Sequence, residues 1–175
     1  NIQGTHNLID SSEEYNVNRF VLVSTDKAVN PTNIMGATKR VAEKLIQSKS
    51  IDSNVKFMAV RFGNVIGSSG SVIPTFQEQI RNGGPITITN PNMQRYFMSI
   101  SEAAQLILQT GAMGAGGEIY VLDMGKPVNI QNIAYELIRL SGLEPETDIE
   151  IEYIGMRPGE KMYEELQTHE ENIID

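Results

Sequence analysis

The residues best suited to acid–base chemistry are Thr25, Asp26 and Lys27, which directly follow an apolar run. A carboxyl group beside an amine can supply both an acid and a base to one reaction. Met35 and Lys39 come next, four residues apart, so on a helix they project from one face about one turn apart. Met35 has no proton to transfer, because a thioether is at best a weak acceptor. Asp26 and Lys27 are therefore the candidates for proton transfer.

Each of these residues also has a purely structural interpretation. An adjacent Asp and Lys often form a solvated pair that contributes less than about 1 kcal/mol. A methionine on a helix usually fills a core, and Lys39 beside Arg40 suits a solvated face. The place of these residues in the sequence favours the functional interpretation, because polar residues at the carboxyl end of a strand in an α/β protein tend to lie in the ligand cleft.

The elements that must hold these residues are predicted by the spacing of apolar side chains. The predicted helices are 1–15, the stretch from the Asn30–Asn33 turn to about residue 48, 72–82, 101–110 with Ser101 as N-cap, and 129–140. The predicted strands are 19–25, 56–62, 86–89, 118–124 and 149–154. This alternation predicts an α/β fold with a parallel sheet. The polar loops 24–33 and 63–71 both follow strands, so we expect them to share one cleft.

Composition narrows the class of protein. With 175 residues and 40% hydrophobic content, the chain can form one domain with a buried core. It has no cysteine, which excludes disulfides and thiolate metal sites, and we expect a cytoplasmic protein without a metal. The net charge of −8 argues against nucleic-acid binding. No apolar run is long enough to span a membrane. Most of the late acidic residues are expected on a solvated face, Glu160 excepted: Glu160, Glu164, Glu165, Glu170, Glu171 and Asp175.

Three longer stretches resemble a known family. They are residues 24–40 (Ser-Thr-Asp-Lys-Ala-Val-Asn-Pro-Thr-Asn-x-Met-Gly-Ala-Thr-Lys-Arg), residues 61–74 (Arg-Phe-Gly-Asn-Val-x-Gly-Ser-x-Gly-Ser-Val-Ile-Pro) and residues 157–161 (Arg-Pro-Gly-Glu-Lys). Together they resemble the polysaccharide-biosynthesis (CapD-type) nucleotide-sugar 4,6-dehydratases, which are extended short-chain dehydrogenase/reductases. The chain has Met-x-x-x-Lys where most short-chain dehydrogenases have Tyr-x-x-x-Lys, and this resembles the long, membrane-anchored branch.

The resemblance implies a partial Rossmann-like, doubly wound parallel sheet that lacks its N-terminal half. Residues 1–70 would carry the remaining Rossmann elements, and residues 71–175 would form mostly a small substrate-binding α/β portion, with 118–124 returning to the main sheet. A dinucleotide site needs a glycine-rich turn between a strand and a helix, and no such turn occurs in the sequence. We therefore expect the C-terminal part of a larger catalytic domain, unable to bind NAD(P) alone, with Phe20–Val23 as an edge strand.

The reaction implied by the resemblance converts UDP-N-acetylglucosamine to its 4-keto-6-deoxy derivative for capsule, O-antigen or glycan synthesis. NAD or NADP would be reduced and reoxidised in each turnover. Asp26 would protonate the departing carbon-6 hydroxyl, Lys27 would take the carbon-5 proton, and Thr25 would bind the carbon-4 oxygen. A carboxyl group that donates a proton at neutral pH needs a raised pKa, and a lysine that accepts one needs a lowered pKa. Both demands imply a dry cleft.

The resemblance also assigns binding residues. The catalytic set would be completed by Met35 and Lys39. The cofactor would contact Ser24, Lys39, Phe62, Gly63, Asn64 and Val65. The UDP-sugar would contact Asn64, Ser71, Val72, Thr87, Arg95, Arg157 and Glu160. Physical reasons support part of this set: the helix that opens after Ser71 has free N–H groups for phosphate, and an arginine fork can hold two phosphate oxygens.

Two other functions stay open. A UDP-sugar 4-epimerase shares the fold but has no elimination step, so the Asp26–Lys27 pair favours the dehydratase. A non-catalytic nucleotide-sugar-binding module is the other alternative. For the whole protein we expect a homo-oligomer, no nucleic-acid partner, no membrane contact by this segment, and a possible anchor at the cytoplasmic face of the membrane through upstream helices.

Overall fold

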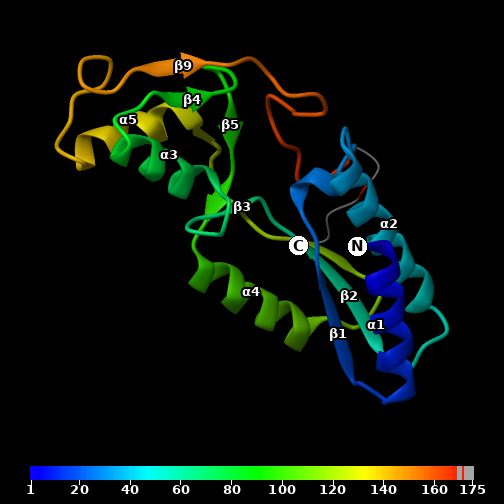
Figure 1. The fold of residues 1–175 in the computed structure, drawn as a ribbon. Coiled ribbons are helices and arrows are strands. Elements are labelled where there is room, and N and C mark those ends of the chain that lie inside the picture. Colours follow the sequence, from blue (N-terminus) through cyan, green and yellow to red (C-terminus); the bar gives the residue numbers. More distant parts are fainter. Residues whose placement is uncertain (169–170, 172–175) are drawn as a thin grey trace. The chain divides into compact units, whose positions relative to one another are not determined.

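The computed structural model describes residues 1–168 and residue 171, and it divides into two compact units. Unit 1 contains Asn1–Gly63, Ser101–Asp123 and the described part of 165–175 (Figure 1). Unit 2 contains Asn64–Ile100 and Met124–Glu164. The chain first passes from unit 1 to unit 2 between Gly63 and Asn64.

Unit 1 is built on a parallel sheet with the strand order β1 (Arg19–Val23), β2 (Lys56–Arg61), β7 (Ile119–Val121). Leu22 pairs with Ala59, and Ala59 pairs with Ile119 on its other side. β7 thus joins the main sheet from within the range 118–124. β1 is hydrogen-bonded to β2 alone among the described strands. The apolar runs form strands because both faces of this sheet are covered.

Three helices cover the sheet of unit 1: α1 (Ile2–Glu14), α2 (Ile34–Lys49) and α4 (Ile100–Met113). α1 and α2 pack side by side on one face (Figure 1). The core there contains Ile9, Leu22, Ala42, Ile46, Val55, Phe57 and Ala59. The other face meets the end of α4, where Gly111 lies against Val21 and Gly114 lies against Met58.

Unit 2 surrounds a second core. Its helices are α3 (Val72–Arg81) and α5 (Ile130–Leu140). Its strand pairs are β3 (Asn64–Val65) with β6 (Phe97–Met98), β4 (Ile86–Ile88) with β9 (Ile151–Tyr153), and β5 (Gln94–Arg95) with β8 (Val128–Asn129). The buried apolar residues are Phe76, Ile80, Ile86, Ile88, Met93, Ile130, Ala134, Ile138, Ile149 and Ile151.

All five predicted helices and all five predicted strands are present, most with slightly shorter bounds. The prediction that Ser101 is an N-cap is wrong, because α4 already begins at Ile100. Serines flank Ile100 on both sides, so cap preference alone could not choose between them. Among the described residues, no helix is long and apolar enough to cross a membrane.

Candidate active site

The candidate acid–base residues lie at the carboxyl end of β1, where the chain enters a short 3-10 helix, η1 (Asp26–Ala28). Asp26 Oδ1 accepts hydrogen bonds from Thr25 Oγ1 at 2.9 Å and from Lys27 Nζ at 3.0 Å. The Asp26 side chain is fully buried, whereas that of Lys27 is 24% exposed. Asp26 Oδ2 is buried and has no hydrogen-bond partner among the described residues. One carboxylate oxygen of Asp26 is thus bonded twice, and the other is enclosed by the protein with its hydrogen-bonding capacity unused among the described residues.

The backbone of this loop is fixed to the next strand. Ser24 N donates to Val60 O at 2.7 Å, and Asp26 N donates to Phe62 O at 3.1 Å. Ser24 Oγ donates to Glu43 Oε1 at 2.6 Å, so this hydroxyl binds a buried carboxylate of α2. Phe62 is buried at the end of β2. These contacts hold Asp26 through the sheet and not only through its own loop.

α2 brings Met35 and Lys39 to the same end of unit 1. Its N-cap is Asn33, whose Oδ1 accepts a hydrogen bond from Gly36 N at 2.8 Å. Val23 is the last residue of β1, and its carbonyl oxygen accepts a hydrogen bond from Lys39 Nζ at 2.9 Å. Met35 is 44% exposed. An ammonium has three N–H donors, so Lys39 fits a cofactor ribose hydroxyl while it keeps its bond to Val23. Met35 presents an exposed apolar thioether one turn before Lys39 on the same helix.

Gly36 allows this arrangement because it has no Cβ. A Cβ at this position would overlap the carbonyl oxygen of Lys27 and lie 3.3 Å from Pro31 Cβ. The start of α2 therefore packs directly against the backbone of η1. This close approach fixes the carbonyl group of one candidate catalytic residue.

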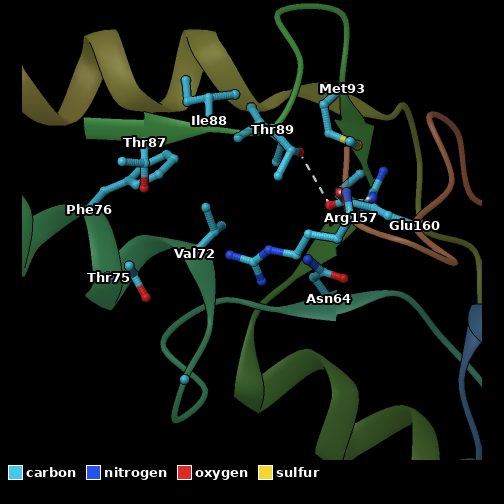
Figure 2. Close-up of a pocket in the computed structure, with 13 residues that line it drawn as sticks. Asn64, Val72, Thr75, Phe76, Thr87, Ile88, Thr89, Met93, Arg157 and Glu160 are labelled. Carbon is cyan, nitrogen blue, oxygen red and sulfur yellow. Dashed lines mark hydrogen bonds and ion pairs between the residues drawn. The ribbon is translucent and has the colours of Figure 1, made fainter. Parts of the chain in front are cut away.

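Six of the seven predicted substrate residues line a cavity of about 240 Å³ in unit 2, and Ser71 is not among its lining residues. Its apolar wall contains Val72, Phe76, Ile88, Met93 and Ile130, and its polar groups come from Asn64, Thr75, Thr87, Thr89, Arg95, Arg157 and Glu160. Figure 2 shows the Arg157 guanidinium pointing into the cavity near Val72 and Asn64. Thr89 Oγ1 donates to Glu160 Oε1 at 3.3 Å. A cavity with one apolar wall and several polar groups suits a base and its attached phosphates.

The two arginines of the cavity differ in how much their guanidinium is already bonded. Arg95 is buried, and its Nη1 donates to Gln94 O at 2.6 Å and to Met162 O at 3.1 Å. Its Nη2 lies 3.6 Å from Glu160 Oε1. Arg157 is exposed. Arg157 is therefore the more accessible cation, and Arg95 mainly anchors the segment that carries Glu160.

Thr87 and Ser71 also differ in availability. Gln79 binds the hydroxyl and the backbone N–H of Thr87. Gln79 Nε2 donates to Thr87 Oγ1 at 2.8 Å, and Thr87 N donates to Gln79 Oε1 at 3.2 Å. Ser71 is the N-cap of α3, but its side chain makes no capping bond. Ser71 Oγ is buried without a partner among the described residues. The N-terminus of α3 thus has a spare hydroxyl as well as spare N–H groups.

Sequence reasoning missed a buried charged cluster in unit 1, formed by Arg40, Glu43, Arg61 and Glu171. Glu43 and Arg61 are fully buried. Burial acts to raise the pKa of Glu43, but hydrogen bonds from Arg61 and Ser24 outweigh it and hold the pKa below its ordinary value. Hydrogen bonds from Arg61 lower the pKa of Glu171 to about 2. The signal in the sequence was Arg61 itself, because an arginine in an apolar strand needs a buried anionic partner.

The expectation of a solvated acidic face is wrong for two residues. Glu171 binds Arg61, and Glu164 is only 9% exposed. Charge runs are usually solvated, but contacts with basic residues far away in the sequence override that tendency here. Glu170 and Asp175 lie outside the described residues.

Comparison with known proteins identifies the family. A sequence profile described as "Polysaccharide biosynthesis protein" matches residues 1–175. The chain belongs to this family. The polysaccharide biosynthesis resemblance seen in the sequence is thereby confirmed.

Relatives of this polysaccharide biosynthesis family member agree with that assignment. The chain is 60% identical over 172 residues to the capsular polysaccharide biosynthesis protein CapD of Staphylococcus aureus, covering 98% of this chain and 28% of that protein. It is 37% identical over 174 residues to a UDP-glucose 4-epimerase of Rickettsia rickettsii, covering 98% of this chain and 50% of that protein. It therefore spans half or less of the length of these two relatives.

A solved structure confirms the fold class. The X-ray structure of Pen from Bacillus thuringiensis superposes with a TM-score of 0.90 and 41% identity, covering 97% of this chain and 53% of that chain. The α/β, Rossmann-like fold predicted from the sequence is confirmed, and the chain carries part of it.

Proposed function

We propose that the chain forms part of an NAD(P)-dependent, nucleotide-sugar-modifying enzyme, and specifically of a UDP-N-acetylglucosamine 4,6-dehydratase. One observation carries the proposal: Asp26 is fully buried, bonded at one oxygen by Thr25 and Lys27, and unbonded at the other among the described residues. An elimination of water needs a base and an acid close together. Asp26 and Lys27 meet that need within one hydrogen-bonded group.

Thr25 and Asp26 would handle the proton of the carbon-4 hydroxyl. The chemistry that bound NAD(P) supplies is removal of a hydride from carbon 4 and its return to carbon 6. Thr25 Oγ1 donates to Asp26 at 2.9 Å, so it can accept the carbon-4 proton while passing its own to the carboxylate. Met35 cannot take this proton. Asp26 then carries the proton that the next step consumes.

Lys27 and Asp26 would carry out the elimination. In this proposal Lys27, whose side chain is 24% exposed, enters the cycle as the neutral amine and acts as the base. It takes the carbon-5 proton, while Asp26 gives its proton to the hydroxyl that leaves carbon 6 as water. When the carbon-6 position has been reduced, Lys27 returns a proton to carbon 5. The proton lost from the carbon-4 hydroxyl thus ends in the water, and the protein regains its starting protonation state.

The nucleotide end of the substrate would be held by unit 2. Arg157, which points into the cavity, and the N-terminus of α3, whose residue Val72 lines it, would bind the diphosphate, with Ser71 as the N-cap residue of that helix. The apolar wall with Phe76 and Ile88 would pack against the uracil, and Glu160 would accept from a ribose hydroxyl. Lys39 of unit 1 would bind the nicotinamide ribose. The remaining proposed cofactor residues are Ser24, Phe62 and Gly63 of unit 1 and Asn64 and Val65 of unit 2.

A UDP-sugar 4-epimerase is the second candidate, favoured by the 37% identity with the Rickettsia epimerase. An epimerase needs proton exchange only at the carbon-4 oxygen. It has no step for the Lys27 ammonium, which lies 3.0 Å from the buried Asp26 carboxylate.

The deciding experiment is incubation of the full-length protein with UDP-N-acetylglucosamine and analysis of the product by mass spectrometry and NMR. A dehydratase gives a product lighter by one water, with a carbon-6 methyl group. An epimerase gives an isomer of unchanged mass, and a binding module leaves the substrate intact. Either of the last two outcomes would refute the dehydratase.

A further inference from the structure

The buried charged cluster of unit 1 is centred on Glu43, whose carboxylate is fully hydrogen-bonded. Its Oε1 accepts from Ser24 Oγ at 2.6 Å and from Arg61 Nε at 2.8 Å. Its Oε2 accepts from Arg61 Nη2 at 2.8 Å and from Arg40 Nη1 at 2.9 Å. The Glu43 side chain is 0% exposed, so water does not substitute for these donors.

Arg61 joins Glu43 to a segment far along the chain. Its Nη1 donates to Glu171 Oε2 at 2.7 Å, and its Nη2 donates to Glu171 Oε1 at 2.9 Å. Arg40 Nη1 also reaches Glu171, at 3.0 Å. Two cations therefore balance two anions. The Arg61 side chain is only 1% exposed. If the Glu171 charge were removed, Glu43 would be the one carboxylate left to balance both Arg61 and Arg40.

The cluster is connected at two points to residues 24–29, which contain Thr25, Asp26 and Lys27 and are called the acid–base loop below. The Ser24 hydroxyl binds Glu43, and Ser24 directly precedes Thr25. Arg61 directly precedes Phe62, whose carbonyl oxygen accepts from Asp26 N at 3.1 Å. A shift of Arg61 or Glu43 would therefore reach Asp26 both through the side chain of Ser24 and through the backbone of β2.

We propose that Glu171 is a positioning residue for the acid–base loop, acting through Arg61 and Glu43 on Ser24 and Asp26. This role rests on the proposed function in one respect, the assignment of Asp26 and Lys27 as proton-transfer groups. Glu171 touches neither of these residues, so it acts on the chemistry only through geometry. Its removal should lower the rate of turnover more than the affinity for substrate, because displacement of a catalytic group acts mainly on the transition state.

The test compares Glu171→Gln with Glu136→Gln in the full-length protein. Gln keeps the length of the side chain and one acceptor for Arg61, so the variant is expected to fold. Glu136 is a matched control, because its side chain is 67% exposed and, among the described residues, pairs only with Arg139 on the surface of α5. Turnover of UDP-N-acetylglucosamine is measured together with hydrogen–deuterium exchange of the peptide that contains residues 24–29, whose amides donate to Val60, Phe62, Thr25 and Asp26.

In Glu171→Gln we expect kcat to fall about tenfold, KM to stay within about twofold, and exchange of the 24–29 peptide to accelerate. Glu136→Gln should match the wild type in all three. Unchanged exchange in Glu171→Gln would overturn the proposal whatever the turnover, and faster exchange with an unchanged kcat would overturn it as well. A wild-type protein that forms no 4-keto product would instead refute the proposed function, while the exchange data would still decide whether Glu171 holds the loop.

Discussion

The close approach of Gly36 to Lys27 gives a prediction with a matched control. We compare Gly36→Ala with Gly4→Ala, because each glycine is the third residue of its helix, α2 or α1. A Cβ on Gly4 would meet no atom within 4 Å. A Cβ on Gly36 would overlap the carbonyl oxygen of Lys27 and lie 3.0 Å from its carbonyl carbon. The same substitution is thus made with and without a steric conflict.

The magnitude follows from the size of the conflict. An ordinary carbon–oxygen contact is about 3.3 Å, so the Lys27 backbone must move by roughly 1 Å to admit the methyl group. Overpacking of this kind costs about 1–3 kcal/mol, whereas alanine gains up to about 1 kcal/mol over glycine in a helix. Gly36→Ala should therefore lose about 1–2 kcal/mol of unfolding free energy, and Gly4→Ala should gain a few tenths to about 1 kcal/mol.

The assays are urea unfolding and formation of the 4-keto product by the full-length variants. A displacement of about 1 Å at a catalytic group can cost about 100-fold in rate, so Gly36→Ala should lose turnover by that order, and Gly4→Ala should keep it. If Gly36→Ala is as stable as Gly4→Ala and retains wild-type turnover, the packing of α2 on η1 does not constrain the active loop, and our account of it is wrong.

Three further predictions concern single side chains. Asp26→Asn should fold, because its remaining oxygen can still accept from Thr25 and Lys27, but kcat should fall by about 10²–10⁴ through loss of the transferable proton; retention of a third of the rate would contradict this role. Glu171 has a pKa of about 2 against an ordinary 4.5, so it contributes stability above pH 4.5 that is lost as the pH falls toward 2. Urea unfolding should therefore show a gap of about 2–3 kcal/mol between wild type and Glu171→Gln at pH 6 that closes toward pH 2; a gap independent of pH would exclude the charge as its cause. Arg157→Met should raise KM for the UDP-sugar about 10- to 100-fold with little change in kcat, whereas Arg139→Met on the exposed face of α5 should change neither; equal effects of the two would remove Arg157 from the binding site.

The main elements could be predicted because their sequence signals are local. The apolar runs that contain Phe20–Val23 and Phe57–Val60 have the pattern of strands covered on both faces, and they form β1 and β2. Asn33 predicts a helix start by its capping chemistry, and it caps α2. Strands of two residues, such as β3 and β8, escaped prediction because they are too short to show any periodicity.

The candidate site was predictable only in part. The polar residues after β1 stand together in the sequence, so their proximity required no knowledge of the fold. Arg61 and Glu171 are 110 positions apart in the sequence, so no local pattern of residues could predict the hydrogen bonds between them. Likewise, the sequence suggested that both Arg95 and Arg157 bind a diphosphate. In the structure, Arg95 Nη1 already donates to the backbone carbonyls of Gln94 and Met162.

The bond between Arg61 and Glu171 has a consequence for synthesis of the protein on the ribosome. Arg61 is synthesised 110 residues before Glu171, its second carboxylate partner. Through that interval the nascent β1–β2 region must keep a guanidinium with an incomplete set of partners, which disfavours its burial. We therefore expect the buried cluster of unit 1 to be completed only after Glu171 has emerged from the ribosome, and the loop with the proposed acid and base to take its final geometry after that.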